Sequence, residues 1–139
     1  MQLADDAAEK WEGDGGRLWL WAVSPTVLVT RVEGYISLEG VRFYTNRADR
    51  MIARSGSLYV FHHWGGVLSW DPQARDRLRT WAGAHGKRLP GTHFLVRSRV
   101  LAMTIEVAGL ALGRKLSAHR SEATFFAALA EVTAQRARV

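Results

Sequence analysis

The sequence predicts an α/β domain with a mixed, mostly parallel sheet of about five strands and four helices. Stretches rich in β-branched and aromatic residues alternate with stretches whose apolar residues recur every three or four positions. The connections between these stretches are only a few residues long. The 139 residues, 47% of them hydrophobic, are enough for one core. The expected order is strand, strand, helix, strand, helix, strand, helix, strand, helix, and such alternation favours right-handed crossovers between parallel strands.

Residues 1–16 are predicted to form an acidic, flexible leader. They carry five Asp or Glu residues against Lys10 alone, and they lack the apolar segment of a secretion signal. Cysteine is absent from the chain, which fits a reducing compartment and excludes disulfides and thiolate metal sites. We therefore expect residues 17–139 to form a single cytoplasmic domain.

Two β-rich stretches, residues 17–23 and 27–36, come first and are separated by a Pro25-containing turn. They predict a hairpin. Ser37 is a suitable N-cap for the first helix, which is expected to end near Gly56 because glycine adopts the left-handed cap conformation readily. The apolar residues of this helix follow helical spacing: Val41, Tyr44, Ala48, Met51 and Ile52.

The third strand is predicted over residues 58–62, a short apolar run typical of a strand covered on both faces. We expect residues 64–70 to form a loop. Asp71 then caps a second helix, with Pro72 at its first position. That helix is expected to turn Ala74, Leu78, Trp81 and Ala82 inward and Arg75 and Arg79 outward.

The last third of the chain predicts two more strands and two more helices. Residues 93–97 form the fourth strand, and Ser98 caps a helix over residues 100–112. Residues 114–118 form a short, charged edge strand. Ser121 opens the last helix, whose inward face carries Phe125, Leu129 and Val132.

This order of elements, together with local features, resembles the STAS domain, and in particular its SpoIIAA-like branch, over nearly the whole domain. The features are Gly34 after the second strand, the apolar third strand, Asp71 at the start of the second helix, and a short strand after Leu-Gly-Arg-Lys at residues 112–115. Anti-sigma-factor antagonists have the STAS fold, and so do the cytoplasmic tails of sulfate transporters. The resemblance implies a bacterial, regulatory protein-interaction module, and not an enzyme.

The phosphorylation site of signalling STAS domains is missing here. In those members the third strand leads to an Asp-Ser-Ser/Thr-Gly turn whose hydroxyl is phosphorylated, which adds about −1.5 to −2 charges to the docking surface. The matching residues of this chain are Asp71, Pro72, Gln73 and Ala74. The resemblance therefore implies no kinase switch of the usual kind, although Ser69, just before the turn, is a possible substitute acceptor.

The predicted helix over residues 100–112 is apolar almost all round, whereas a helix on a sheet needs only one apolar stripe. One set of residues can pack on the sheet, and the other must be covered by the last helix, by a partner or second copy, or by lipid or another apolar ligand. The two sets are Val100, Met103, Val107 and Leu110 on one side and Leu101, Ile105, Ala108 and Leu112 on the other.

No residues predict catalysis, a metal or a cofactor. His62 and His63 precede Asp71 by a few residues, but neighbouring strand residues point to opposite faces and cannot share one metal ion without a bulge. Asp71 is explained by helix capping. The chain has no Gly-x-Ser-x-Gly elbow and no P-loop.

The leading hypothesis is a non-enzymatic module that docks a protein partner, or a second copy, around the Asp71 turn and the helix over residues 100–112. Basic residues favour this region, because residues 71–139 hold twelve Lys or Arg against five Asp or Glu. The alternative is an anionic membrane or small apolar ligand, with the same helix as a lid; nucleic acid is not expected, since the tryptophans are better explained as core residues. The predicted binding residues are Trp64, Trp70, Asp71, Gln73 and Arg75 near the turn, with Leu101, Ile105 and Ala108 on the helix.

Overall fold

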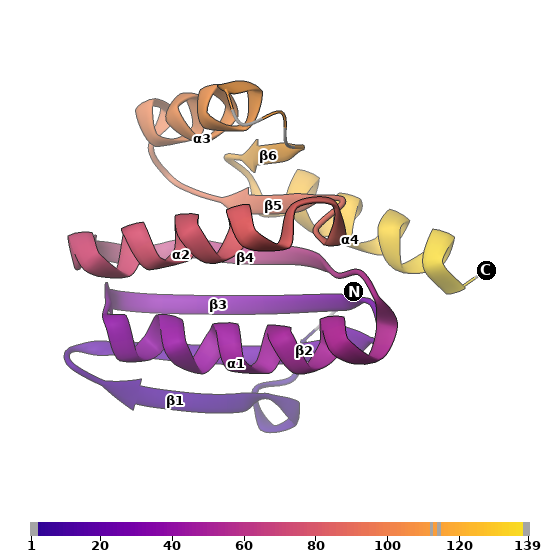
Figure 1. Cartoon of the computed structure of the whole chain (residues 1–139). Helices are drawn as coiled ribbons and strands as arrows, with labels where there is room; N and C mark the ends of the chain where they lie inside the picture. Colours follow the sequence, from indigo (N-terminus) through magenta and orange to yellow (C-terminus); the bar gives the residue numbers. More distant parts are fainter. Residues whose placement is uncertain (1–2, 112, 114, 138–139) are drawn as a thin grey trace.

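A computed structural model describes residues 3–111, 113 and 115–137. It contains a six-stranded sheet and four α-helices (Figure 1). The strands are β1 (Glu9–Gly13), β2 (Gly16–Ser24), β3 (Val27–Ile36), β4 (Tyr59–Trp70), β5 (Thr92–Leu95) and β6 (Leu116–His119), and the helices are α1 (Leu38–Ser55), α2 (Pro72–His85), α3 (Arg99–Ala111) and α4 (Glu122–Ala137).

The strands lie side by side in the order of the sequence, from β1 to β6. β1, β2 and β3 are antiparallel, and β3 to β6 are parallel. The predicted α/β class and mixed, mostly parallel sheet are confirmed. From β3 to β6 each connection moves one strand further across the sheet in the same direction. Because such crossovers are right-handed, their helices α1, α2 and α3 lie on one face of the sheet. The last helix, α4, covers the other face (Figure 1).

Residues 9–13, expected to belong to a flexible leader, form the edge strand β1 and account for the sixth strand. A hairpin of two residues, Asp14 and Gly15, joins β1 to β2, and both residues have positive φ, at 53° and 81°. This is the type I′ pattern for which Asp-Gly is a preferred sequence. The segment before β1 also packs, since the Trp21 indole Nε1 donates a 2.9 Å hydrogen bond to the Ala4 carbonyl oxygen.

The loop expected over residues 64–70 is instead the second half of β4. Parallel pairing with β3 continues to Ile36 and Trp70, with register shifts along the way, whereas pairing with β5 stops at His63 and Leu95. Gly65 and Gly66 lower the β-propensity of this stretch, which is why the sequence suggests a loop. β4 therefore extends past β5 and carries Trp64 and Trp70 on a strand.

Three helices are capped at the residues that the sequence predicts. Ser37 caps α1 through its side chain, which accepts from the Gly40 N–H, and Gly56 closes α1 with φ of 83°. Asp71 caps α2 and accepts from the Gln73 N–H at 2.9 Å. Ser98 caps α3 by accepting from the Leu101 N–H at 3.2 Å. These caps fix the residues at which the helices begin and at which α1 ends.

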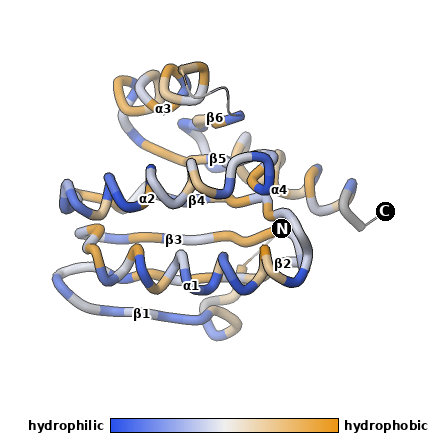
Figure 2. The backbone as a smooth tube through the Cα atoms, viewed as in Figure 1, coloured by the Kyte–Doolittle hydropathy of each residue, from blue (hydrophilic) through white to orange (hydrophobic). Residues whose placement is uncertain are grey.

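Two main cores lie on the two faces of the sheet. One packs α1 and α2 on the even-numbered residues of β2 and β4, such as Leu20 and Val60. The other packs α4 on Phe61 and Leu95. Hydrophobic residues run along β3, β4 and α3 (Figure 2). No helix among the described residues is long and apolar enough to cross a membrane.

Candidate functional site

The candidate site is a groove between α2 and α3, above β4 and β5, which we call the α2–α3 groove. Its volume is about 230 Å³. Helix α3 packs on β5 and β6 through Ala102, against Phe94 and Val96, and so lies beyond α2 (Figure 1). The groove is lined by Ile36, Val41, Tyr44, His62, Trp64, Trp70, Ala74, Arg75, Leu78, Arg79, Trp81, Ala82, Gly83, Leu89, Thr92, Phe94, Leu101, Thr104, Ile105, Ala108 and Leu116.

Asp49 on α1 holds the α2 wall of the groove in place. Its Oδ1 accepts hydrogen bonds from the Trp81 indole Nε1 at 2.7 Å and pairs with His85 Nε2 at 2.8 Å. The Trp81 ring also packs edge-on against Tyr44, with centroids 5.3 Å apart. The indole N–H of Trp81 is thus satisfied, and the ring itself contributes an apolar surface to the wall of the groove.

His62 on β4 is a titratable group that lines the groove. Its Nδ1 shares a 2.8 Å hydrogen bond with the Thr30 hydroxyl. The rings of Tyr44 and Phe94 lie 5.1 and 5.0 Å from the His62 ring. Burial lowers the pKa of His62 to about 3, because the apolar surroundings disfavour the imidazolium. Burial also raises the pKa of Tyr44, so both groups are neutral at pH 7.

The charged side chains on the groove are Arg75 and Arg79, both on α2 and both exposed. Arg75 Nε lies 3.9 Å from Asp76 Oδ1. None of the lining residues that the structure describes is Asp or Glu. A long apolar surface with two cations at its edge can therefore hold an apolar molecule and attract an anion.

No family model matches the chain, and no curated protein matches it. A crystal structure of an uncharacterized protein of the DUF3478 family, from Shewanella loihica PV-4 and with a SpoIIAA-like fold, superposes with a TM-score of 0.63 at 10% identity, covering 86% of this chain and 90% of that one. This chain has the SpoIIAA-like fold. The comparison confirms the fold that the sequence resemblance implies.

A second solved structure superposes less well on this chain. It is an anti-sigma factor antagonist from Mycobacterium paratuberculosis, at 17% identity and a TM-score of 0.48, covering 87% of this chain and 91% of that one. In this chain Asp71 occupies the junction between β4 and α2, as the resemblance implies.

The structure brings six of the eight predicted binding residues to the α2–α3 groove. Two do not line it: Asp71 caps α2, and Gln73 is exposed on the first turn. The sequence missed Arg79, Thr104 and Phe94 as lining residues. For Arg79 a signal was available, since it follows Arg75 by four positions on the same helix face. The six that line it are Trp64, Trp70, Arg75, Leu101, Ile105 and Ala108.

The outer face of α3 is exposed. We call it the α3 stripe and define it as Val100, Met103, Val107 and Leu110, which are 74%, 58%, 62% and 84% exposed. The suggestion that the last helix covers this face is wrong, because α4 packs on the opposite side of the sheet. Leu112, assigned to the other apolar set, lies outside the described residues.

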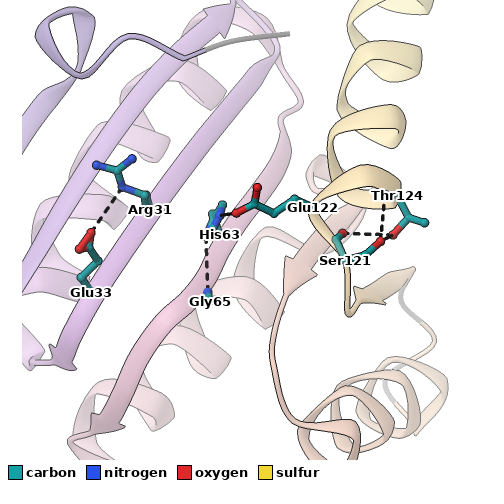
Figure 3. A network of polar contacts seen from close by, with 7 residues as sticks. All are labelled: Arg31, Glu33, His63, Gly65, Ser121, Glu122 and Thr124. Carbon is teal, nitrogen blue, oxygen red and sulfur yellow. Dashed lines mark hydrogen bonds and ion pairs between the residues drawn. The ribbon is translucent and has the colours of Figure 1, made fainter.

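His62 and His63 point to opposite faces, as predicted for neighbouring strand residues. His63 faces α4, where its Nε2 lies 3.2 Å from Glu122 Oε1 (Figure 3). On the same face His93 Nδ1 lies 3.0 Å from His119 Nε2. Within the described part of the chain, no three His, Asp or Glu residues are placed to hold a metal ion.

Proposed function

We propose that this chain is a non-enzymatic SpoIIAA-like binding module that holds a small apolar ligand in the α2–α3 groove. The observation that carries the proposal is the groove itself, about 230 Å³ in volume and lined mainly by apolar and aromatic side chains. An apolar cavity of about 150 Å³ can already take a benzene molecule. The groove therefore has room for a ring or a short alkyl chain.

The groove chemistry supports binding without catalysis. His62 is the one lining residue of the kind that usually acts as a general base. With its pKa at about 3, it is a weak base at pH 7, far from the value that suits proton transfer. Its Nδ1 is also engaged with the Thr30 hydroxyl.

Filling part of the groove should weaken ligand binding. Ala108 is exposed on α3 and lines the groove, so the indole of an Ala108→Trp variant would occupy part of its volume. We expect the affinity for 1-octanol, measured by isothermal titration calorimetry, to fall at least about tenfold, the equivalent of about two methylene groups kept out of the groove.

Ala111→Trp is the matched control, because Ala111 is exposed on the same helix and does not line the groove. It should bind 1-octanol within about twofold of the wild type. Wild-type protein that gives no binding heat with 1-octanol would overturn the proposal, as would equal binding by both variants.

The α3 stripe supports a second candidate function, docking of a partner protein or a second copy. Its residues are spaced by three, four and three positions, the a and d pattern by which helices pack on other helices. This seam is narrower than the broad apolar face that lets a helix lie in a membrane surface. The stripe thus favours a protein partner over lipid.

Self-association through the stripe can be tested by light scattering over a concentration series. The wild type should show a concentration-dependent rise toward the mass of a dimer, and Val107→Glu should remain monomeric because a charge is costly in an apolar interface. Ala84→Glu on α2, exposed and off the stripe, is the control and should behave as the wild type. A wild type that is monomeric at all concentrations would contradict self-association.

A further inference from the structure

We propose that the ligand of the α2–α3 groove is a single-chain anionic amphiphile, with its alkyl chain in the groove and a carboxylate head group held by Arg75 and Arg79. This inference rests on the proposed function and adds the chemical class of the ligand. It follows from the charges around the groove, the state of the two arginines and the size of the groove.

The charge of the groove has one sign. Arg75 and Arg79 are its ionised lining residues, and none of the described lining residues is acidic. His62 is neutral, since its imidazole is buried and hydrogen-bonded to Thr30. A low-dielectric wall beside two cations strengthens their attraction for an anion. Charge complementarity therefore selects an anionic ligand over a neutral or cationic one.

The two arginines are free to bind a head group. No described residue forms a hydrogen bond or ion pair with Arg79. Among the described residues, the only acidic partner of Arg75 is Asp76, whose Oδ1 lies 3.9 Å from Arg75 Nε and so beyond hydrogen-bond distance. Arg75 and Arg79 are four residues apart on α2, which places them one above the other on one face. Guanidinium groups bind carboxylates through two parallel N–H···O bonds.

The size and lining of the groove define the rest of the ligand. Beyond the arginines the walls are mainly apolar and aromatic, formed by residues such as Leu78, Phe94 and Ile105. The volume of about 230 Å³ is below the roughly 300–1,000 Å³ of sites for drug-sized molecules. One short alkyl chain fits this volume, whereas the two chains of a phospholipid do not.

The test compares three probes with the same eight-carbon chain and different head groups: octanoate, 1-octanol and octylamine. Affinities are measured by isothermal titration calorimetry at pH 7 and low salt, where the carboxylate is ionised. We expect octanoate to bind at least about tenfold more tightly than 1-octanol, and octylamine to bind more weakly than 1-octanol. Added salt should weaken octanoate binding alone.

Variants assign the effect to the two arginines. In Arg75→Gln/Arg79→Gln, octanoate should bind within about twofold of 1-octanol, and 1-octanol itself should bind as it does to the wild type. Arg77→Gln/Arg88→Gln is the matched control, with the same change in net charge at exposed arginines that do not line the groove. This control should keep the advantage of octanoate.

The outcomes separate this inference from the proposed function. If no probe binds, both fail. If 1-octanol binds and octanoate binds no more tightly, the groove is an apolar site without a head-group subsite, and the inference alone fails. The inference also fails if octanoate keeps its advantage in Arg75→Gln/Arg79→Gln, because the selectivity then comes from elsewhere in the molecule.

Discussion

The Phe125→Ala variant is expected to lose about 3–5 kcal/mol of free energy of unfolding, the usual cost of emptying a buried phenylalanine site. Phe125 is 0% exposed and is the aromatic centre of the core between α4 and the sheet. Its ring meets Phe61 edge-on, with centroids 5.7 Å apart, and lies 5.9 Å from the rings of His63 and His119. Urea denaturation followed by circular dichroism measures the loss.

Phe126→Ala is the matched control, because Phe126 is the neighbouring phenylalanine but is only half-buried. It should lose less than half as much stability. Since α4 lies on the face opposite the α2–α3 groove, neither substitution should alter ligand affinity in protein that remains folded. A loss below about 1 kcal/mol in Phe125→Ala would mean that α4 is not docked on the sheet as described.

Local chemistry in the sequence predicted much of the fold. Four N-caps begin helices as predicted: Ser37, Asp71, Ser98 and Ser121. An N-cap is a local interaction, because its side-chain oxygen accepts a hydrogen bond from a backbone N–H only two or three residues later in the chain. The β1–β2 hairpin was missed for a different reason. Its Asp14-Gly15 turn is a standard signal, but the acidic composition around it suggested a leader.

Features that depend on distant pairing were beyond a local interpretation. Residues 64–70 are extended because β3 continues as far as Ile36 and pairs with them along its edge. The α2–α3 groove exists because the strand order β4, β5, β6 makes α3 the neighbour of α2 and leaves α4 for the other face. The sequence identified α3 as too apolar for a helix with one buried stripe. It could not predict which of its faces would meet α2.

Acid should destabilise the protein through His62. The pKa of this imidazole is lowered by burial to about 3, whereas an unfolded histidine titrates near 6.5. Between these values the unfolded chain binds a proton that the folded chain does not, so stability falls as the pH falls below 6.5 and levels off below about 3. The expected loss from His62 is about 1.4 kcal/mol per pH unit, or roughly 3 kcal/mol at pH 4.

A His62→Gln variant isolates this contribution, because an amide does not titrate and can still bond to the Thr30 hydroxyl. Every other titratable group, including His93 with its pKa lowered by burial to about 4, is present in both proteins, so its contribution cancels in the comparison. Urea denaturation from pH 7 to pH 4 should give a shallower decline for the variant, by about 1.4 kcal/mol per pH unit below pH 6. Equal slopes would show that the His62 imidazole accepts a proton in the folded protein, which would make the groove floor more accessible to water and more basic than its packing implies.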